Sequence, residues 1–202
     1  MSSAERIPIM ESFYSVQGEG FYSGRPAYFI RTAGCDVGCV WCDVKESWNR
    51  YEHPEIEIDR IVAAIQSSGT DFVVVTGGEP AMYDLTRLTR EFHKSGMEIA
   101  METSGAYPIL GEYDWICLSP KKFKLPLEEN YAKANELKMI IFNKHDLEWA
   151  EELRKKVRPG CKLYLQPEWD KSEKMLPLII QHVKENTYWS ISLQTHKFMN
   201  IP

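Results

Sequence analysis

The sequence contains no apolar run that approaches the ~18 residues of a membrane-spanning helix. Its N-terminal segment, residues 1–15, carries Glu5 and Arg6 and lacks the apolar core of a signal peptide. We therefore expect a cytoplasmic protein that does not bind membranes. Basic residues are fewer than acidic ones: the sequence has 24 Lys and Arg and 29 Asp and Glu, which gives a net charge of −5. With no long basic run either, nonspecific binding to nucleic acid is not expected.

Cysteines are few and unevenly placed. Three of the five follow the pattern C-x₃-C-x₂-C, as Cys35, Cys39 and Cys42. A secreted disulfide framework does not have this spacing, whereas a cytosolic metal site does. Cys117 and Cys161 lie in or beside apolar runs, and we expect them to be small core residues.

The order of the segments predicts an α/β fold. Hydrophobic residues make up 44% and charged residues 26%, as in ordinary globular proteins, and 202 residues favour a single domain over 1–202. Short β-branched or aromatic runs predict strands at 27–31, 72–76, 98–103, 115–119, 138–142, 162–166 and 189–195. Helical periodicity marks 58–65, 85–92, 145–157 and 176–183. Because a full (β/α)₈ barrel takes ~250 residues, we expect an incomplete, open (β/α) barrel with a parallel sheet.

Polar clusters follow directly after most of the predicted strands. They occupy positions 76–80, 102–105, 119–121, 166–168 and 194–197. In a parallel α/β fold the carboxyl ends of the strands meet at one edge, where ligands bind. The clusters therefore predict one ligand site at this edge.

The cysteine triplet calls for a metal, because three thiolates so close together repel one another unless a cation neutralises them. Structural zinc takes four protein ligands, usually as paired C-x₂-C or Cys/His motifs. The nearest fourth candidate is His53, and no second pair exists. Three cysteines without a fourth fit a [4Fe–4S] cluster that has one open iron. A zinc-binding, non-enzymatic module stays open as an alternative.

The triplet, with Trp41 before the last cysteine, resembles the signature of the radical S-adenosylmethionine superfamily. The segment 76–80, TGGEP, is similar to the GGEP motif of that superfamily. The resemblance implies a [4Fe–4S] cluster whose open iron binds S-adenosylmethionine, which is cleaved to a 5′-deoxyadenosyl radical. An activase that places a glycyl radical on a partner protein would share both motifs and remains a second alternative.

Segments near both ends of the chain resemble one particular family within this superfamily. Residues 15–21, SVQGEGF, and residues 193–202, LQTHKFMNIP, are similar to the 7-carboxy-7-deazaguanine synthases, as are 102–105 and 119–121. This implies radical-mediated ring contraction of 6-carboxy-5,6,7,8-tetrahydropterin to 7-carboxy-7-deazaguanine with loss of ammonia, in queuosine and other deazapurine biosynthesis. It also implies a homodimer and a flavodoxin-like reductant.

The same resemblance assigns residues to two ligands. For S-adenosylmethionine it implies Trp41, Cys42, Asp43, Gly77, Gly78, Glu79, Ser104, Ser119, Pro120, Lys121 and Gln166. For the pterin it implies Val16, Gln17, Gly18, Glu19, Arg31, Thr76, His196 and Pro202. Arg31 would bind the substrate carboxylate, as a planar guanidinium does well. Glu79 would pair with the methionine ammonium, and Glu19 and the carboxylate of Pro202 would meet the amine edge of the pterin.

One position departs from the pattern of this family. Many members have a Thr or Ser two residues after the last cysteine, and its hydroxyl ligates a Mg²⁺ ion that bridges to the substrate carboxylate. Here the residue is Val44, which offers no oxygen, whereas Mg²⁺ needs a near-octahedral set of oxygen ligands. We therefore expect activity that is nearly independent of Mg²⁺, with Arg31 as the positive partner of the carboxylate.

Overall fold

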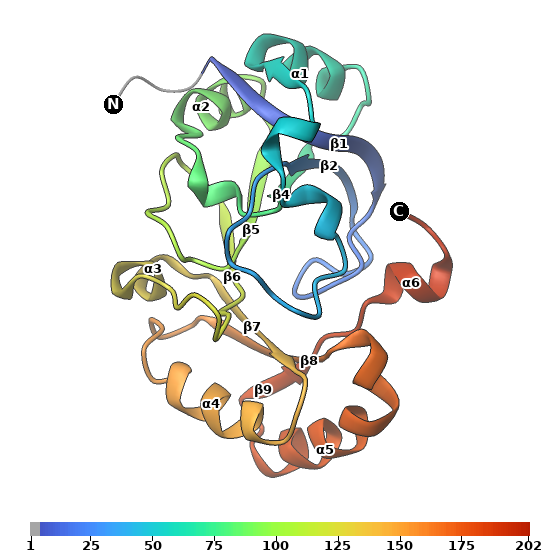
Figure 1. Ribbon diagram of the computed structural model, residues 1–202, viewed down its shortest axis with the longest axis vertical. Coiled ribbons are helices and arrows are strands. Elements are labelled where there is room, and N and C mark those ends of the chain that lie inside the picture. The colour runs from blue at the N-terminus through green and yellow to red at the C-terminus, as the bar shows by residue number, and fades with distance from the viewer. Residues whose placement is uncertain (1–4) are drawn as a thin grey trace.

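The computed structural model describes residues 5–202, which form a nine-stranded sheet with helices along it (Figure 1). The first four positions of the N-terminal segment discussed above lie outside the described residues. The strands are β1 (Arg6–Val16), β2 (Pro26–Thr32), β3 (Glu55–Glu57), β4 (Phe72–Gly77), β5 (Glu98–Thr103), β6 (Trp115–Leu118), β7 (Glu136–Ile141), β8 (Lys162–Pro167) and β9 (Trp189–Ile191). The α-helices are α1 (Ile58–Gln66), α2 (Thr86–Lys94), α3 (Glu128–Lys133), α4 (His145–Leu153), α5 (Ser172–Glu185) and α6 (Thr195–Met199). Short 3₁₀ helices are η1 (Lys45–Ser47), η2 (Arg50–Glu52), η3 (Pro80–Met82) and η4 (Trp169–Lys171).

The strands lie in the order β3-β1-β2-β4-β5-β6-β7-β8-β9. Every neighbouring pair from β2 to β9 is parallel, while β1 pairs antiparallel with both β2 and β3. The edge strands β3 and β9 are at opposite ends of this order, so the sheet is open. The predicted α/β fold, an incomplete (β/α) barrel, is therefore confirmed.

Each of the strands predicted from the sequence corresponds to one of β2 and β4–β9. The last is shorter than predicted, because β9 ends at Ile191 and the chain then turns into α6. The sequence patterns missed β1, in which Ile7, Pro8 and Ile9 are buried in succession and no alternation marks the strand. They also missed β3, α3 and α6, which are too short to show a period. The predicted helix at 145–157 ends at Leu153.

The helices cover the outer face of the sheet in two groups. Figure 1 shows α1 and α2 beside the first part of the sheet and α4 and α5 beside the second. The buried apolar side chains of α1 and α2 pack in one cluster with Val73 and Val75 of β4. Those of α4 and α5, such as Leu153 and Ile179, pack in a second cluster with Leu137 of β7. These four helices do not cover the opposite, inner face of the sheet, where a ligand site can form.

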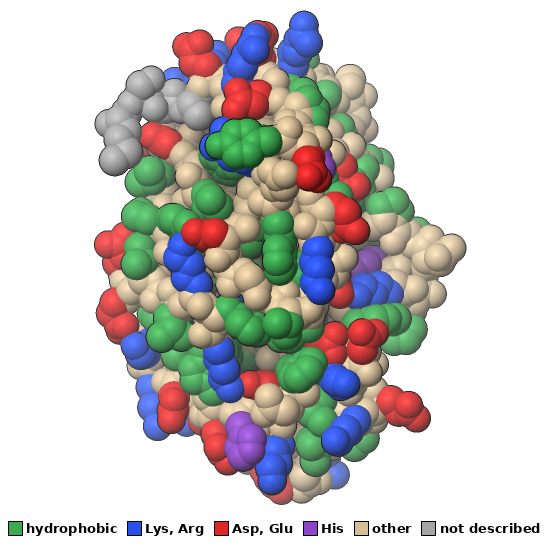
Figure 2. Space-filling view, in the orientation of Figure 1, with side chains coloured by type: hydrophobic (Ala, Val, Ile, Leu, Met, Phe, Trp, Pro, Cys, Tyr) green, Lys and Arg blue, Asp and Glu red, His purple; other side chains and the backbone are tan. Residues whose placement is uncertain are grey.

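The surface carries charges of both signs. On the face that Figure 2 shows, acidic and basic side chains are interspersed, and neither sign gathers into one large patch. Among residues 5–202, no helix combines the length and the apolar character that crossing a membrane requires.

Candidate active site

The inner face of the sheet changes from apolar to polar along the strand order. Alternate residues of a strand point to the same face, so Val74 of β4 faces inward while Val73 and Val75 pack under the helices. The inward positions of β5, β7 and β8 include Glu102, Lys138 and Gln166. These polar side chains line a hollow at the edge where the parallel strands end.

The first cavity at this edge has a volume of about 220 Å³. All but one of the residues that the resemblance assigns to S-adenosylmethionine line it, namely Trp41, Cys42, Asp43, Gly77, Gly78, Glu79, Ser104, Ser119, Lys121 and Gln166. Cys35 and Cys39 line the same cavity. Pro120 lines a smaller hollow beside it, which shares Trp41 and Lys121 with the first cavity. We call the first cavity the cysteine cavity.

The second cavity, of about 310 Å³, adjoins the first. It is lined by every residue that the resemblance assigns to the pterin, namely Val16, Gln17, Gly18, Glu19, Arg31, Thr76, His196 and Pro202. The two cavities share the side chains of Glu19, Asp43, Val44, Glu102 and Gln194. We call it the arginine cavity, after Arg31. Two ligands bound in these cavities would be separated by no more than the shared side chains.

The cysteine triplet lies on the loop between β2 and η1, where the three side chains pack with Val37 and Ala106. Burial raises the pKa of the Cys35 thiol to about 11 and also raises the pKa of Cys39. A thiol in such surroundings ionises only when a cation compensates its charge. A donor set made of thiols alone, on one wall of a cavity, fits an iron–sulfur cluster.

The zinc alternative required His53 as a fourth ligand. In the structure the ring Nε2 of His53 lies 2.8 Å from the carbonyl oxygen of Glu46, and His53 does not belong to the lining of the cysteine cavity. Within residues 5–202, no three or more His, Cys, Asp or Glu side chains are already arranged around a common metal-ion position. His53 therefore does not supply the fourth protein ligand that structural zinc uses.

The Glu79 carboxylate is buried and surrounded by donors of the chain itself. Its Oε1 accepts from the Ala81 amide at 3.0 Å and from the Thr103 hydroxyl. Its Oε2 accepts from the Ser104 amide at 2.8 Å and from the Ser104 hydroxyl. A carboxylate offers about four lone-pair directions, so these four donors occupy its capacity. Glu79 thus joins the end of β4 to the end of β5, whatever it contributes to a ligand.

The TGGEP turn also packs tightly against the loop that carries the cysteines. The Gly78 amide donates to the carbonyl of Thr32, and the Glu79 amide to the carbonyl of Gly34. A Cβ atom at Gly78 would collide with the Gly34 carbonyl oxygen. Glycine is therefore needed here for the close approach of two backbone segments, in addition to any approach to a ligand.

Lys121 places an ammonium group inside the cysteine cavity. Its Nζ donates to the carbonyl of Ser119 at 2.6 Å and to the Ser119 hydroxyl at 2.7 Å. Burial lowers the pKa of Lys121. The Nζ atom also lies 5.6 Å from the centre of the Trp41 ring. The arrangement gives the cavity one cation that an anionic group of a ligand can approach.

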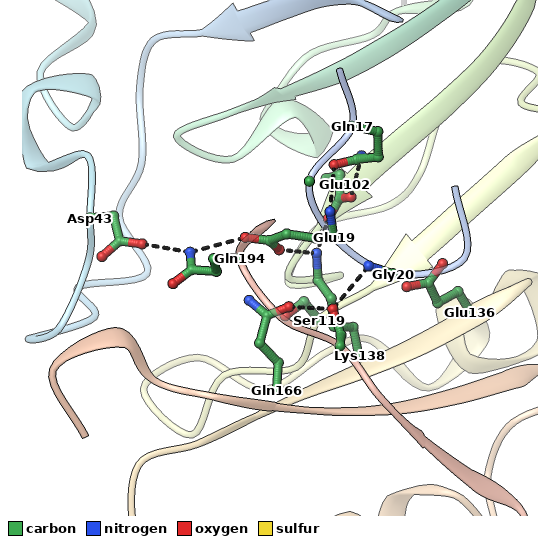
Figure 3. A network of polar contacts seen from close by, with 12 residues as sticks. Gln17, Glu19, Gly20, Asp43, Glu102, Ser119, Glu136, Lys138, Gln166 and Gln194 are labelled. Carbon is green, nitrogen blue, oxygen red and sulfur yellow. Dashed lines mark hydrogen bonds and ion pairs between the residues drawn. The ribbon is translucent and has the colours of Figure 1, made fainter. Parts of the chain in front are cut away.

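Figure 3 shows an ion triad of Glu19, Glu102 and Lys138. The two carboxylates line both cavities, and Lys138 lines the cysteine cavity. Lys138 Nζ donates to Oε2 of Glu19 at 2.6 Å and to Oε2 of Glu102 at 2.7 Å. Gln17 Nε2 donates to the other oxygen of Glu102 at 3.3 Å, and Gln194 Nε2 to the other oxygen of Glu19 at 3.0 Å. Burial opposes the ionisation of Glu19, but the attraction and hydrogen bond of Lys138 outweigh it and hold the pKa of Glu19 at about 2.

The C-terminal segment closes one side of the site. Gln194 Nε2 and Lys197 Nζ both donate to Oδ2 of Asp43, at 3.0 and 2.9 Å, which connects this segment to the cysteine loop. The Thr195 amide donates to the Gly18 carbonyl at 2.9 Å. A Cβ atom at Gly18 would collide with His196, so this glycine lets the histidine reach the arginine cavity.

Two further side chains shape the arginine cavity. Arg31 reaches it from β2, and its Nε donates to Oε1 of Glu11 at 2.6 Å. Val44 lines both cavities, next to Asp43, and adds an apolar surface where they meet.

The sequence patterns did not single out Glu102, Lys138, Gln194 and Lys197 as site residues. Glu102, Gln194 and Lys197 belong to polar clusters that follow strands, and that position was their only signal. Lys138 begins the apolar run KMIIF, and a lysine within a buried strand is a signal in its own right, because an unpaired buried charge is costly.

The open parallel barrel, the thiol triplet and the cavity at the carboxyl ends of the strands define a radical S-adenosylmethionine enzyme. In agreement, the family model described as "Radical SAM superfamily" matches residues 29–158. Within that superfamily the chain belongs to the 7-carboxy-7-deazaguanine synthases. It is 53% identical to the 7-carboxy-7-deazaguanine synthase of Flavobacterium psychrophilum, over 100% of this chain and 96% of the relative.

Two further comparisons agree with this family. The 7-carboxy-7-deazaguanine synthase of Synechocystis is 46% identical, over 96% of this chain and 93% of the relative. The crystal structure of QueE from Escherichia coli matches with a TM-score of 0.83 at 30% identity, over 93% of both chains. These relatives extend over nearly the whole chain, so the activase and zinc-module alternatives are not supported.

Proposed function

We propose that this chain is a 7-carboxy-7-deazaguanine synthase that converts 6-carboxy-5,6,7,8-tetrahydropterin into 7-carboxy-7-deazaguanine with loss of ammonia. The observation that carries the proposal is the pair of adjoining cavities, one lined by the three cysteines and the other by Arg31. A radical reaction needs the radical source and its target in contact while water stays away. Two ligand sites that share one wall supply this arrangement.

In the cysteine cavity, Cys35, Cys39 and Cys42 would hold a [4Fe–4S] cluster with S-adenosylmethionine beside it. When bound, the cluster and S-adenosylmethionine supply the 5′-deoxyadenosyl radical. The ammonium group of Lys121 suits the carboxylate of the cofactor, because an ammonium and a carboxylate form a charge-assisted hydrogen bond. The other residues of this wall, in particular Ser119 and Gln166, offer hydrogen bonds to its polar groups.

In the arginine cavity, the guanidinium of Arg31 suits the carboxylate of the pterin, with which it can form two parallel hydrogen bonds. The same cavity is lined by the carboxylate of Glu19 and the amide of Gln17, which suit the N–H groups of the pyrimidinone edge. Thr76, His196 and Pro202 complete the lining. With Val44 where a hydroxyl ligand is usual in the family, the cationic partner of the substrate carboxylate is Arg31 and no Mg²⁺ ion is required.

Four further features of the proposal come from the sequence: chain length suggests the single domain, the N-terminal segment suggests the location, and the family resemblance suggests the dimer and the reductant. The chain would act as one radical S-adenosylmethionine domain over residues 1–202, assemble as a homodimer and work in the cytoplasm. Its electrons would come from a flavodoxin-like reductant. Size-exclusion chromatography with light scattering tests the dimer, and turnover with a flavodoxin in place of a chemical reductant tests the electron source.

The proposed function is tested on anaerobically purified protein. The expected result is a brown protein with about four irons per chain that forms 7-carboxy-7-deazaguanine and ammonia from 6-carboxytetrahydropterin, S-adenosylmethionine and a reductant. Arg31→Met serves as the matched variant, since it should raise the KM for the pterin and leave S-adenosylmethionine binding unchanged. A colourless zinc protein, or a brown protein that leaves the pterin unchanged, would contradict the proposal.

A further inference from the structure

Lys138 carries a charge that the roles proposed above do not use. Its side chain is 4% exposed, it extends from β7 to the wall between the two cavities, and its ammonium group contacts two carboxylates at once. Because Oε2 of Glu19 and Oε2 of Glu102 bind the same Nζ atom, these two carboxylates are close neighbours. One cation between two anions leaves this triad with one negative charge in excess.

The two carboxylates retain capacity for a ligand. A carboxylate accepts about four hydrogen bonds. Glu19 accepts from Lys138 and Gln194 and has the Gln166 amide beside it, and Glu102 accepts from Lys138 and Gln17 and has the Cys117 thiol beside it. At least one lone pair of each carboxylate is left. Both carboxylates line the arginine cavity. Their remaining lone pairs form an acceptor surface, and the negative excess suits a ligand edge that consists of N–H donors.

We propose that Lys138 is a positioning residue for pterin binding, which holds Glu19 and Glu102 side by side as ionised acceptors for the N–H groups of the pterin ring. This inference rests on the proposed function. Without the ammonium group, two neighbouring carboxylates that are largely shielded from water would resist joint ionisation and share a proton. A protonated carboxyl group turns one acceptor position into a donor, which faces the N–H groups of the ligand unfavourably.

Other titratable groups face the triad from each neighbouring element. They are Glu136 on β7, Cys117 on β6, Lys121 after β6, Asp43 on the cysteine loop, and His196 and Lys197 on α6. Burial raises the pKa of Glu136 and lowers the pKa of His196. All of these groups are kept in the variants described next. A pH dependence that appears only in a variant therefore reports the loss of the Lys138 charge.

The experiment uses the cluster-loaded enzyme at saturating S-adenosylmethionine and measures the pterin KM from pH 7 to 9. Lys138→Met keeps most of the length of the side chain and removes its charge. We expect a KM about tenfold above wild type at pH 7, which corresponds to about 1.4 kcal/mol, and a smaller difference at pH 9, where both carboxylates ionise. Lys138 also lines the cysteine cavity, but its ammonium group is bound to the two carboxylates and none of the cofactor's groups is assigned to it. The KM for S-adenosylmethionine should therefore change less than about twofold. A pterin KM within twofold of wild type at every pH would overturn the proposal and leave the triad a structural ion pair.

Two more variants control for folding and for the loss of an ion pair as such. Lys122→Met also removes an ammonium group from a buried carboxylate, Asp146 at 2.6 Å, but outside the two cavities, and should leave the pterin KM and its pH dependence unchanged. Lys138→Met/Glu102→Gln restores the net charge of the triad and tests the same point if the single variant does not fold. Its pterin KM should stay raised but become independent of pH from 7 to 9.

A double variant with the KM of the wild type, or with the pH dependence expected for Lys138→Met, would overturn the role of Lys138. Wild-type enzyme that does not turn over the pterin at all would instead contradict the proposed function. The two failures are therefore distinguishable.

Discussion

Glu79 provides a prediction that separates a structural role from a ligand-binding role. Both of its carboxylate oxygens accept a backbone N–H, Oε1 from Ala81 and Oε2 from Ser104. In Glu79→Gln one oxygen becomes an NH₂ group. Whichever way the amide is turned, that NH₂ group faces a backbone N–H, and two donors then oppose each other in a buried place. Turning the amide over cannot remove this opposition of two donors.

The size of the effect follows from these contacts. Losing one hydrogen bond to a charged acceptor and leaving its buried donor without a partner lowers the free energy of unfolding by about 3 kcal/mol. For a chain of this size that corresponds to a fall in Tm of about 6–12 °C. The assay is thermal unfolding of the cluster-loaded protein, followed by circular dichroism without added S-adenosylmethionine. Glu112→Gln, at an exposed position, is the matched control and should leave Tm unchanged.

A role for Glu79 in ligand binding alone gives a different result. In that case Glu79→Gln would have the Tm of the wild type without S-adenosylmethionine, and only the stabilisation on adding the cofactor would be lost. A Tm within about 2 °C of wild type, less than 1 kcal/mol at this chain length, would therefore refute the reasoning from the four donors.

The remaining predictions concern the cluster, the metal requirement and the triad. Alanine at any one cysteine of the triplet should abolish iron binding and turnover, whereas Cys117→Ala should keep both; iron analysis and product assays measure this. The triplet consists of Cys35, Cys39 and Cys42. Turnover after chelation, followed by titration of Mg²⁺, should be nearly constant, and a many-fold rise would show that the ion binds despite Val44. A carboxyl group with a depressed pKa stabilises the fold above its unfolded pKa and loses this effect as the pH falls. For Glu19, the difference in unfolding free energy between wild type and Glu19→Gln should therefore be fully present above pH 4.5 and vanish toward pH 2. Urea titrations at several pH values measure this difference. A difference that stays constant over this range would contradict the Lys138–Glu19 pairing.

Local patterns were sufficient to predict the parallel part of the fold and the edge of the sheet at which the two cavities lie. Strands such as β4 and β8 show continuous apolar runs, and the polar residues after them lie at one edge because parallel strands end there. Strand β1, which lies between β3 and β2, has no such pattern. Near its N-terminal end, residues 7–9 are buried in succession, and the residues that follow are half-buried or exposed. Only the pairing with β2 and β3 therefore defines it as a strand.

The interior of the site depended on contacts that no local pattern contains. Lys138 meets Glu19 and Glu102 across 119 and 36 residues of sequence, and Gln194 meets Glu19 across 175. The full set of donors around Glu79 also becomes visible only when β4 and β5 lie side by side. The sequence motifs indicated most of the residues that line the two cavities. The wall that the two cavities share could be identified only from the three-dimensional structure.

The central claim is that two ligands react across the wall that both cavities share. The most direct test follows a deuterium atom from the carbon of the tetrahydropterin that bears the carboxylate. Cluster-loaded enzyme is incubated with this substrate, S-adenosylmethionine and reductant, and the nucleosides are analysed by mass spectrometry. The account predicts deuterium in the 5′-deoxyadenosyl group. Formation of 7-carboxy-7-deazaguanine with no deuterium in that group would contradict it.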